Sequence, residues 1–128
     1  MTSTASLAEL NSRLAARGVP AVGIERFRPN LVLDGLQAFD EDHIDELAIS
    51  TYEGVVRLKL VKPCVRCTIP SVDPATGAQG VEPGDTLAGF RADARMQGGI
   101  TFGMNAIVLE GVECTLRPGQ PVAVTLNF

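Results

Sequence analysis

The pattern of hydrophobic positions predicts one amphipathic helix at the start of the chain. Three leucines recur at a spacing of three and then four residues, which places them on one helical face: Leu7, Leu10 and Leu14. We expect the helix to span residues 3–17, because Gly18 and Pro20 end the pattern. Ser6 and Glu9 have the S-x-x-E spacing of a capping box. The expected role of this helix is packing.

Beyond Gly18 the pattern changes to short apolar runs, which predict strands. The clearest run, residues 54–62, alternates apolar and basic positions as a half-buried strand does, and it follows a shorter run at 47–50. Residues 20–35 hold two candidate strands interrupted by Pro29, which lacks a backbone donor. Other extended runs are expected at residues 64–72, 98–111, 112–119 and 120–128.

The segments between these runs carry turn and helix signals. Residues 73–77 read DPATG, in which proline fixes φ and glycine accepts positive φ, so we expect a tight turn. Residues 83–95 are expected to hold a short helix with Asp85 as its cap. Gly103 interrupts an apolar strand, which indicates a bulge or a close approach by a ligand.

These elements predict a single α+β domain, mainly β, over residues 1–128. We expect a closed or nearly closed β-barrel with an N-terminal helix and one further short helix, because closure removes exposed strand edges. A chain of 128 residues with 45% hydrophobic positions buries enough surface to fold without a metal or a disulfide.

Composition excludes several classes of protein. No apolar stretch approaches the roughly 20 residues of a membrane-spanning helix, and the first residues do not resemble a secretory signal. The three cysteines are an odd number, which favours reduced thiols and a cytoplasmic location. The formal charge of −4 comes without a basic stripe, so nucleic-acid binding is disfavoured.

Charged residues gather in two places. Five acids lie within residues 40–46, which we interpret as a solvated loop, with His43, the only histidine, at the surface. Nine of the eleven basic residues are arginines, which suit oxyanions. Arg26 and Arg28 share one face if their segment is extended, and they either pair with nearby acids or form a clamp for a phosphate or another oxyanion.

The stretch KPCVRCTIP at residues 62–70 leaves several interpretations open. Cys64 and Cys67 could belong to a zinc site, a redox dithiol or a disulfide, or be two unrelated thiols. Too few other ligands exist for a typical zinc site, and the residues after Cys67 do not favour the helix that redox dithiols use. If the segment is a strand, residues three apart face opposite sides, which favours unrelated thiols.

Several motifs taken together resemble a known family. In chain order they are SLAELNSRL, RFRPNLVL, the acidic segment with LAIS, VKPCVRCTIPSVDPATG and FGMNAIVLEG. They resemble the MOSC domain at the C-terminal end of molybdenum cofactor sulfurases and of amidoxime-reducing molybdoenzymes. The resemblance covers essentially the whole chain, and RFRPN with the C-x-R-C stretch is its most specific part.

The resemblance implies a β-barrel that holds molybdenum on a pterin cofactor. By position, Cys67 would be the thiolate ligand of the metal and the catalytic residue. Arg28 would contact the cofactor, with Asn30 nearby, Arg66 beside the thiolate and Asn105 on the strand that lines the same pocket. Family members typically reduce N-hydroxylated compounds, so an oxidoreductase module is the expectation.

The departures from the family keep other functions open. The chain has neither the N-terminal β-rich half nor an iron–sulfur domain found in fuller members, so a partner chain would supply the rest of the cofactor site or the electrons. One alternative is a sulfur carrier, in which Cys67 accepts persulfide sulfur from a pyridoxal-phosphate-dependent desulfurase. Another is a non-catalytic barrel that binds a partner.

Overall fold

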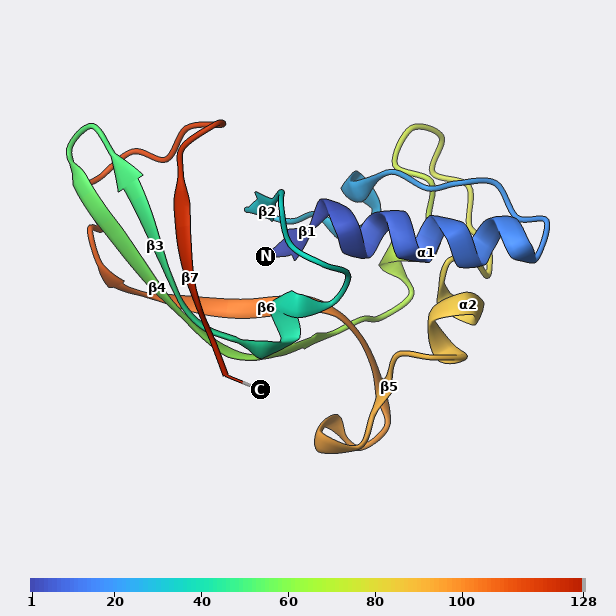
Figure 1. Cartoon of the computed structure of the whole chain (residues 1–128). Coiled ribbons are helices and arrows are strands. Elements are labelled where there is room, and N and C mark those ends of the chain that lie inside the picture. The colour runs from blue at the N-terminus through green and yellow to red at the C-terminus, as the bar shows by residue number, and fades with distance from the viewer. Residues whose placement is uncertain (128) are drawn as a thin grey trace.

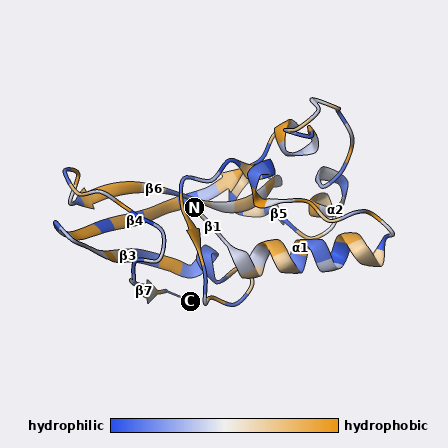
Figure 2. Ribbon diagram, turned by 90° about the horizontal axis from the view of Figure 1, so that it is seen from above, coloured by the Kyte–Doolittle hydropathy of each residue, from blue (hydrophilic) through white to orange (hydrophobic). Residues whose placement is uncertain are grey.

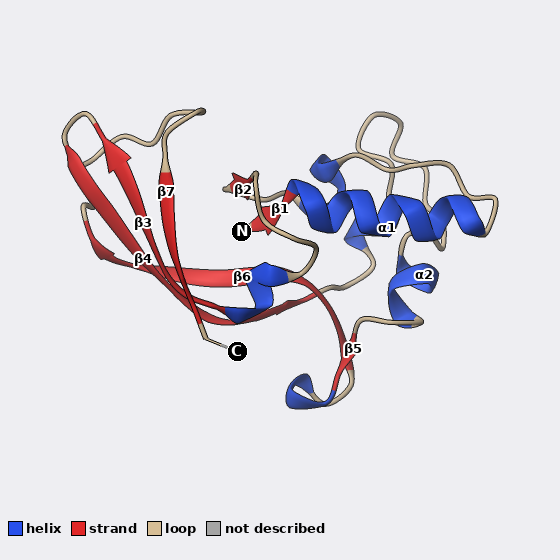
Figure 3. Ribbon diagram, in the orientation of Figure 1, coloured by secondary structure: helices blue, strands red, loops and turns tan. Residues whose placement is uncertain are grey.

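The computed structural model describes residues 1–127 as strands on one side and helices on the other (Figures 1 and 3). The elements in chain order are β1 (Thr2–Ser3), α1 (Thr4–Ala16), β2 (Val32–Leu33), β3 (Ile44–Thr51), β4 (Gly54–Val65), α2 (Gly84–Ala88), β5 (Ala92–Asp93), β6 (Gly99–Glu110) and β7 (Val122–Leu126). Short 3-10 helices lie at Ile24–Phe27, Asp40–His43, Ile69–Ser71 and Ala94–Met96. The prediction of a mainly β α+β fold with an N-terminal helix and a second short helix is confirmed.

Helix α1 forms as its leucine pattern predicts, but its cap differs. Leu10 and Leu14 are fully buried, and Gly18 follows the helix with a positive φ of 71°. The cap is Ser3, whose Oγ accepts a hydrogen bond from the backbone N–H of Ser6 at 3.1 Å. The capping box expected at Ser6 and Glu9 is therefore wrong, because the helix begins two residues before Ser6.

The main sheet has five strands in the order β5-β6-β4-β3-β7. The two strands expected at residues 47–50 and 54–62 are present as parts of β3 and β4, which pair in antiparallel register from Glu46 opposite Lys59 to Thr51 opposite Gly54. A separate two-stranded parallel sheet pairs β1 with β2. Over residues 1–127, β7 has β3 as its one neighbour, so the sheet is not closed into the expected barrel.

Three expected strands are absent from the described residues. Ile24–Phe27 is a 3-10 helix, and only Val32–Leu33 is extended in the 20–35 segment. Residues 112–119 form turns between β6 and β7. The run at 64–72 leaves β4 after Val65 and turns into the 3-10 helix at Ile69–Ser71.

The expected turn at residues 73–77 is present, whereas the expected cap of the second helix is not. The DPATG turn is confirmed, since Gly77 N–H donates to the Asp73 carbonyl at 2.7 Å. Asp85 lies inside the first turn of α2, where Pro83 is the cap residue, so its expected capping role is wrong.

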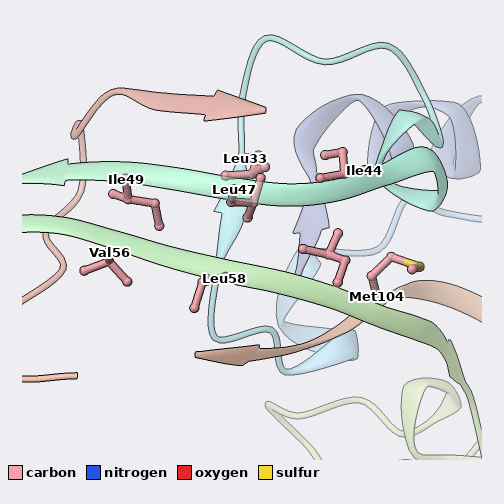
Figure 4. Close-up of a cluster of buried hydrophobic side chains, with 8 residues drawn as sticks. Leu33, Ile44, Leu47, Ile49, Val56, Leu58 and Met104 are labelled. Carbon is pink, nitrogen blue, oxygen red and sulfur yellow. The ribbon is translucent and has the colours of Figure 1, made fainter. Parts of the chain in front are cut away.

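Buried side chains form two clusters. The helix-side cluster joins α1 and α2 to β6 through Leu10, Leu14, Phe27, Leu87 and Phe102. The sheet-side cluster lies between β2, β3, β4 and β6 and consists of Leu33, Ile44, Leu47, Ile49, Val56, Leu58, Leu60 and Met104 (Figure 4). Strong hydrophobic colouring continues along β4 and β6 beyond these clusters (Figure 2), where Ile107, Val108 and Leu109 are exposed.

The acidic segment at 40–46 is not a solvated loop. Glu41 is fully buried and its Oε2 accepts a hydrogen bond from Ser3 Oγ, while Asp42 makes a two-bond ion pair with Arg91. Charge spacing alone did not reveal that this segment turns toward α1. His43 is exposed, as expected.

Gly103 sits at a close backbone approach. Its φ is +83°, and a Cβ at this position would lie 2.6 Å from the Met1 carbonyl oxygen and 2.9 Å from Thr2 Cγ2. The neighbour that requires glycine here is thus the first strand of the chain. This contact brings β1 against β6, where Met104 N–H donates to the Met1 carbonyl at 2.9 Å.

A candidate cofactor pocket beside Cys67

The two cysteines of the C-x-x-C stretch occupy different backbone environments. Cys64 lies near the end of β4 and is half-buried, whereas Cys67 lies beyond the strand and is exposed. The period-two argument therefore does not apply across the pair, although both residues are free thiols. Within residues 1–127, no group of three or more His, Cys, Asp and Glu side chains is placed to hold a metal ion.

Cys67 lines a pocket of about 340 Å³ together with Arg28. The pocket is formed by the 3-10 helix before Pro29 and by the chain that leaves β4, and its lining comprises Arg26, Phe27, Arg28, Val65, Arg66, Cys67, Ile69 and Pro70. The two most specific motifs of the sequence, RFRPN and C-x-R-C, thus face one another across the same space.

Arg28 is held in an unusual backbone conformation at the pocket rim. Its φ and ψ are 48° and 49°, the left-handed region that costs a non-glycine residue about 1–2 kcal/mol. The preceding turn is closed by a hydrogen bond from Arg28 N–H to the Glu25 carbonyl at 3.2 Å. Arg28 is exposed, and its guanidinium makes no ion pair or side-chain hydrogen bond within residues 1–127, which leaves its donors available to a ligand.

Arg66 lies in one wall of the pocket and forms hydrogen bonds to Phe27 in the other wall and to Phe102 of β6. Its Nε and Nη2 donate to the Phe102 carbonyl at 2.8 and 2.6 Å, and its Nη1 donates to the Phe27 carbonyl at 3.0 Å. The guanidinium also lies over the Phe27 ring, 5.2 Å from its centroid. Burial lowers the pKa of Arg66, while the neighbouring Cys64 and Cys67 act in the opposite direction.

The MOSC domain family model matches residues 1–123 of the chain. The chain belongs to the MOSC domain family. It is 41% identical over 128 aligned residues to mitochondrial amidoxime reducing component 2 of Rattus norvegicus, an alignment that covers 95% of the chain and 35% of that protein. It is 39% identical over 125 residues to mitochondrial amidoxime-reducing component 1 of Homo sapiens, covering 94% of the chain and 34% of the relative. The chain thus spans about a third of the length of these relatives.

The MOSC domain places a second arginine in the pocket, Arg26, for which the family resemblance implied no cofactor contact. Arg26 lines the same space as Arg28, and its Nη1 donates to the Pro70 carbonyl at 3.2 Å. The signal was present in the R-x-R spacing, but the shared-face argument assumed an extended segment. The structure instead brings both residues to the pocket from a 3-10 helix and the left-handed residue that follows it.

Two other predicted cofactor contacts of the MOSC domain lie elsewhere. Asn30 lines a different cavity, between β2 and the loop before β7. Asn105 is exposed on β6 opposite Lys62 of β4. Their cofactor roles remain predictions, as do those of Cys67, Arg28 and Arg66.

The helices of the MOSC domain are short. Within residues 1–127, none is both long enough and apolar enough to cross a membrane. The names of the relatives are mitochondrial, and the cytoplasmic location expected from the thiols remains a prediction.

Proposed function

We propose that this MOSC domain binds the molybdenum cofactor through the pocket beside Cys67 and works as part of an oxidoreductase that acts on N-hydroxylated compounds. The observation that carries the proposal is that Cys67 and Arg28 line one pocket. The names of the relatives support the substrate class, since an amidoxime is an N-hydroxylated compound.

The pocket residues fit such a cofactor better than a bare metal ion. One exposed thiol cannot complete a metal site, and no further cluster of ligands lies within residues 1–127. A single thiolate suits a metal that arrives with other ligands, and soft thiolate suits a transition metal. Arg26 and Arg28 add positive charge for an anionic group of the same ligand.

Each pocket residue then has a distinct role. Cys67 supplies the thiolate, which must lose its proton to bind. Arg28 offers donors to the anionic part of the ligand, and Arg66 holds both walls in place through the Phe27 and Phe102 carbonyls. When bound, the molybdenum supplies the redox chemistry that reduces the N–O bond.

The rest of the activity depends on partners. We propose that further polypeptide completes the cofactor site and the barrel, and that a separate electron donor supplies reducing equivalents. The five-stranded sheet that ends at β7 supports this part of the proposal, because it leaves room for additional strands.

Molybdenum analysis tests the metal ligand directly. We expect protein from a host that makes the cofactor to carry molybdenum, and Cys67→Ser to retain less than about a tenth of it, because the coordinating thiolate is lost. Cys64→Ser is the matched control and should keep the wild-type content, since Cys64 does not line the pocket. Absence of molybdenum from the wild type, even when the remainder of a relative is supplied as partner, contradicts the proposal.

A sulfur carrier is the second candidate, because Cys67 is exposed and Cys64 is half-buried. In this reaction the Cys67 thiolate attacks the terminal sulfur of a persulfide on a pyridoxal-phosphate-dependent desulfurase, and the thiolate of the desulfurase leaves. The same variants separate the two functions by mass spectrometry. Gain of one sulfur atom on Cys67, without molybdenum, favours the carrier.

A further inference from the structure

The strands form a ring with one gap. β7 pairs with β3, β3 with β4 and β4 with β6. The ring continues from β6 to β1 through the Met104 N–H, which donates to the Met1 carbonyl, and through the Met1 nitrogen, which donates to the Met104 carbonyl, both at 2.9 Å. Since β1 pairs with β2, the interruption lies between β2 and β7 (Figure 1).

A groove lines this gap. Two adjoining cavities of about 390 and 490 Å³ share Val32, Leu33, Gly119, Gln120 and Val122. The groove is therefore bounded by β2 on one side and by β7 with its preceding loop on the other. Gln120 lines both cavities, and its Nε2 is a buried donor with no hydrogen-bond partner within residues 1–127.

The edge of β7 presents backbone groups to the gap. The Pro121 carbonyl accepts from Ser50 N–H at 3.1 Å, and Asn127 N–H donates to the His43 carbonyl at 2.6 Å. Because backbone groups alternate in an antiparallel ladder, the odd-numbered residues bond to β3 and the N–H groups of the even-numbered residues between them point outward. A row of unpaired groups of this kind is a template for strand pairing.

The side chains of β7 show that its inner face is uncovered. Val122 and Val124 stand opposite the buried residues Ile49 and Leu47 of β3, which places them on the core side of the sheet. Val124 is nevertheless 36% exposed and the next core-side residue, Leu126, 39%. The strand VAVTL contains no charged residue and no proline, the residues that commonly protect an exposed strand edge from pairing.

We propose that the groove between β2 and β7 is a strand-acceptor site for an extended segment of a β-rich polypeptide, with at least about five residues to match β7 and apolar side chains at alternate positions. In the curated relatives about two thirds of the length lies outside the matched region, so the same domain stands beside further polypeptide there. This inference rests on the part of the proposed function in which further polypeptide completes the barrel, and it is independent of molybdenum binding, so the two can fail separately.

A second copy of the chain fits the groove less well than a single strand. Suppose that β7 of a second copy paired with β7 of the first. The β3 of the second copy would then lie on the other side of the inserted strand, because β3 and β7 are paired in each copy. That side is where β2 already lies. A single strand fits between β2 and β7, whereas the sheet of a second copy would clash with β2.

Hydrogen exchange with a designed peptide tests the site. The probe is a seven-residue capped peptide in which valine and threonine alternate between two terminal lysines. We expect it to slow exchange of the Val122, Val124 and Leu126 amides by about tenfold or more at saturation, because these N–H groups gain partners. The Ala123 and Thr125 amides, which already face β3, should change little.

Two matched controls separate strand pairing from apolar adhesion. The same peptide with N-methylated backbone nitrogens at alternate residues loses its donors and should give no protection. Val124→Pro removes an outward N–H at an edge position that tolerates proline, so the protein should stay folded and lose the effect. Equal protection by the methylated peptide, or no saturable protection by the parent peptide on the wild type, overturns the proposal.

The molecular mass of the protein in solution, measured without peptide, shows whether a second copy already occupies the edge of β7. A stable dimer whose β7 amides are already protected without peptide would show that a second copy occupies the edge, and it would also overturn the proposal. A monomer with fast-exchanging outward amides is the expected starting state.

Discussion

The helix-side and sheet-side clusters differ in how completely they are covered. Every residue of the helix-side cluster is at most 2% exposed, and Phe27 stacks on Phe102 with ring centroids 4.1 Å apart. The sheet-side cluster continues into strands whose core-side residues, such as Val124, remain exposed. The candidate pocket belongs to the covered side, because Arg66 bonds to the carbonyls of that same aromatic pair. The aromatic residues behind the pocket are therefore fully buried within this domain, whereas the core-side face of β7 is not.

The largest effect is expected from removing the aromatic centre of the helix-side cluster. Phe102→Ala should reduce the free energy of unfolding by about 3–5 kcal/mol, because it leaves a cavity beside Phe27 and Leu14. Chemical denaturation measures this loss. A loss below about 1 kcal/mol would mean that the helix-side cluster is no more tightly packed than the sheet-side cluster.

An intermediate effect is expected from Arg66→Lys. A lysine keeps the charge but cannot span the Phe27 and Phe102 carbonyls, so we expect a loss of about 1–2 kcal/mol in denaturation experiments. Arg28→Lys is the matched control and should stay within about 0.5 kcal/mol of the wild type, since the Arg28 guanidinium makes no ion pair or hydrogen bond within residues 1–127. Equal losses in the two variants would contradict the assignment of Arg66 to a structural role and of Arg28 to ligand binding.

The smallest effect on stability is expected on the outer face of the sheet, where Ile107 lies opposite Lys59. Ile107→Lys should change the free energy of unfolding by less than about 0.5 kcal/mol, because Ile107 is 52% exposed on β6. The same variant should lower self-association, which light scattering measures, because it places a charge on an apolar strand. A large destabilisation would show that this outer face of β6 is covered in solution.

The sequence was most informative where one periodic pattern determines the structure. Alternation in residues 54–62 predicted β4 and its buried Val56, Leu58 and Leu60, and the leucine spacing predicted α1. Both patterns reflect burial against a single neighbour, which a local window can detect.

Features set by distant contacts were missed. The Phe27 carbonyl, in the 3-10 helix before the left-handed Arg28, accepts a hydrogen bond from Arg66, 39 residues away. Burial of Glu41 depends on Ser3, 38 residues away. Within residues 1–127 the expected barrel is not closed, because β7 has only β3 beside it, and no local pattern specifies which strands become neighbours across a sheet.

The position of Arg66 has a consequence for the order of events in the cell. Its side chain joins segments separated by 39 and 36 residues, so the pocket exists only after both long loops have closed. Residues near Cys67 in the chain cannot build the site by themselves during synthesis. A ligand that contacted both Cys67 and Arg28 would therefore bind only molecules in which both of these loops have closed.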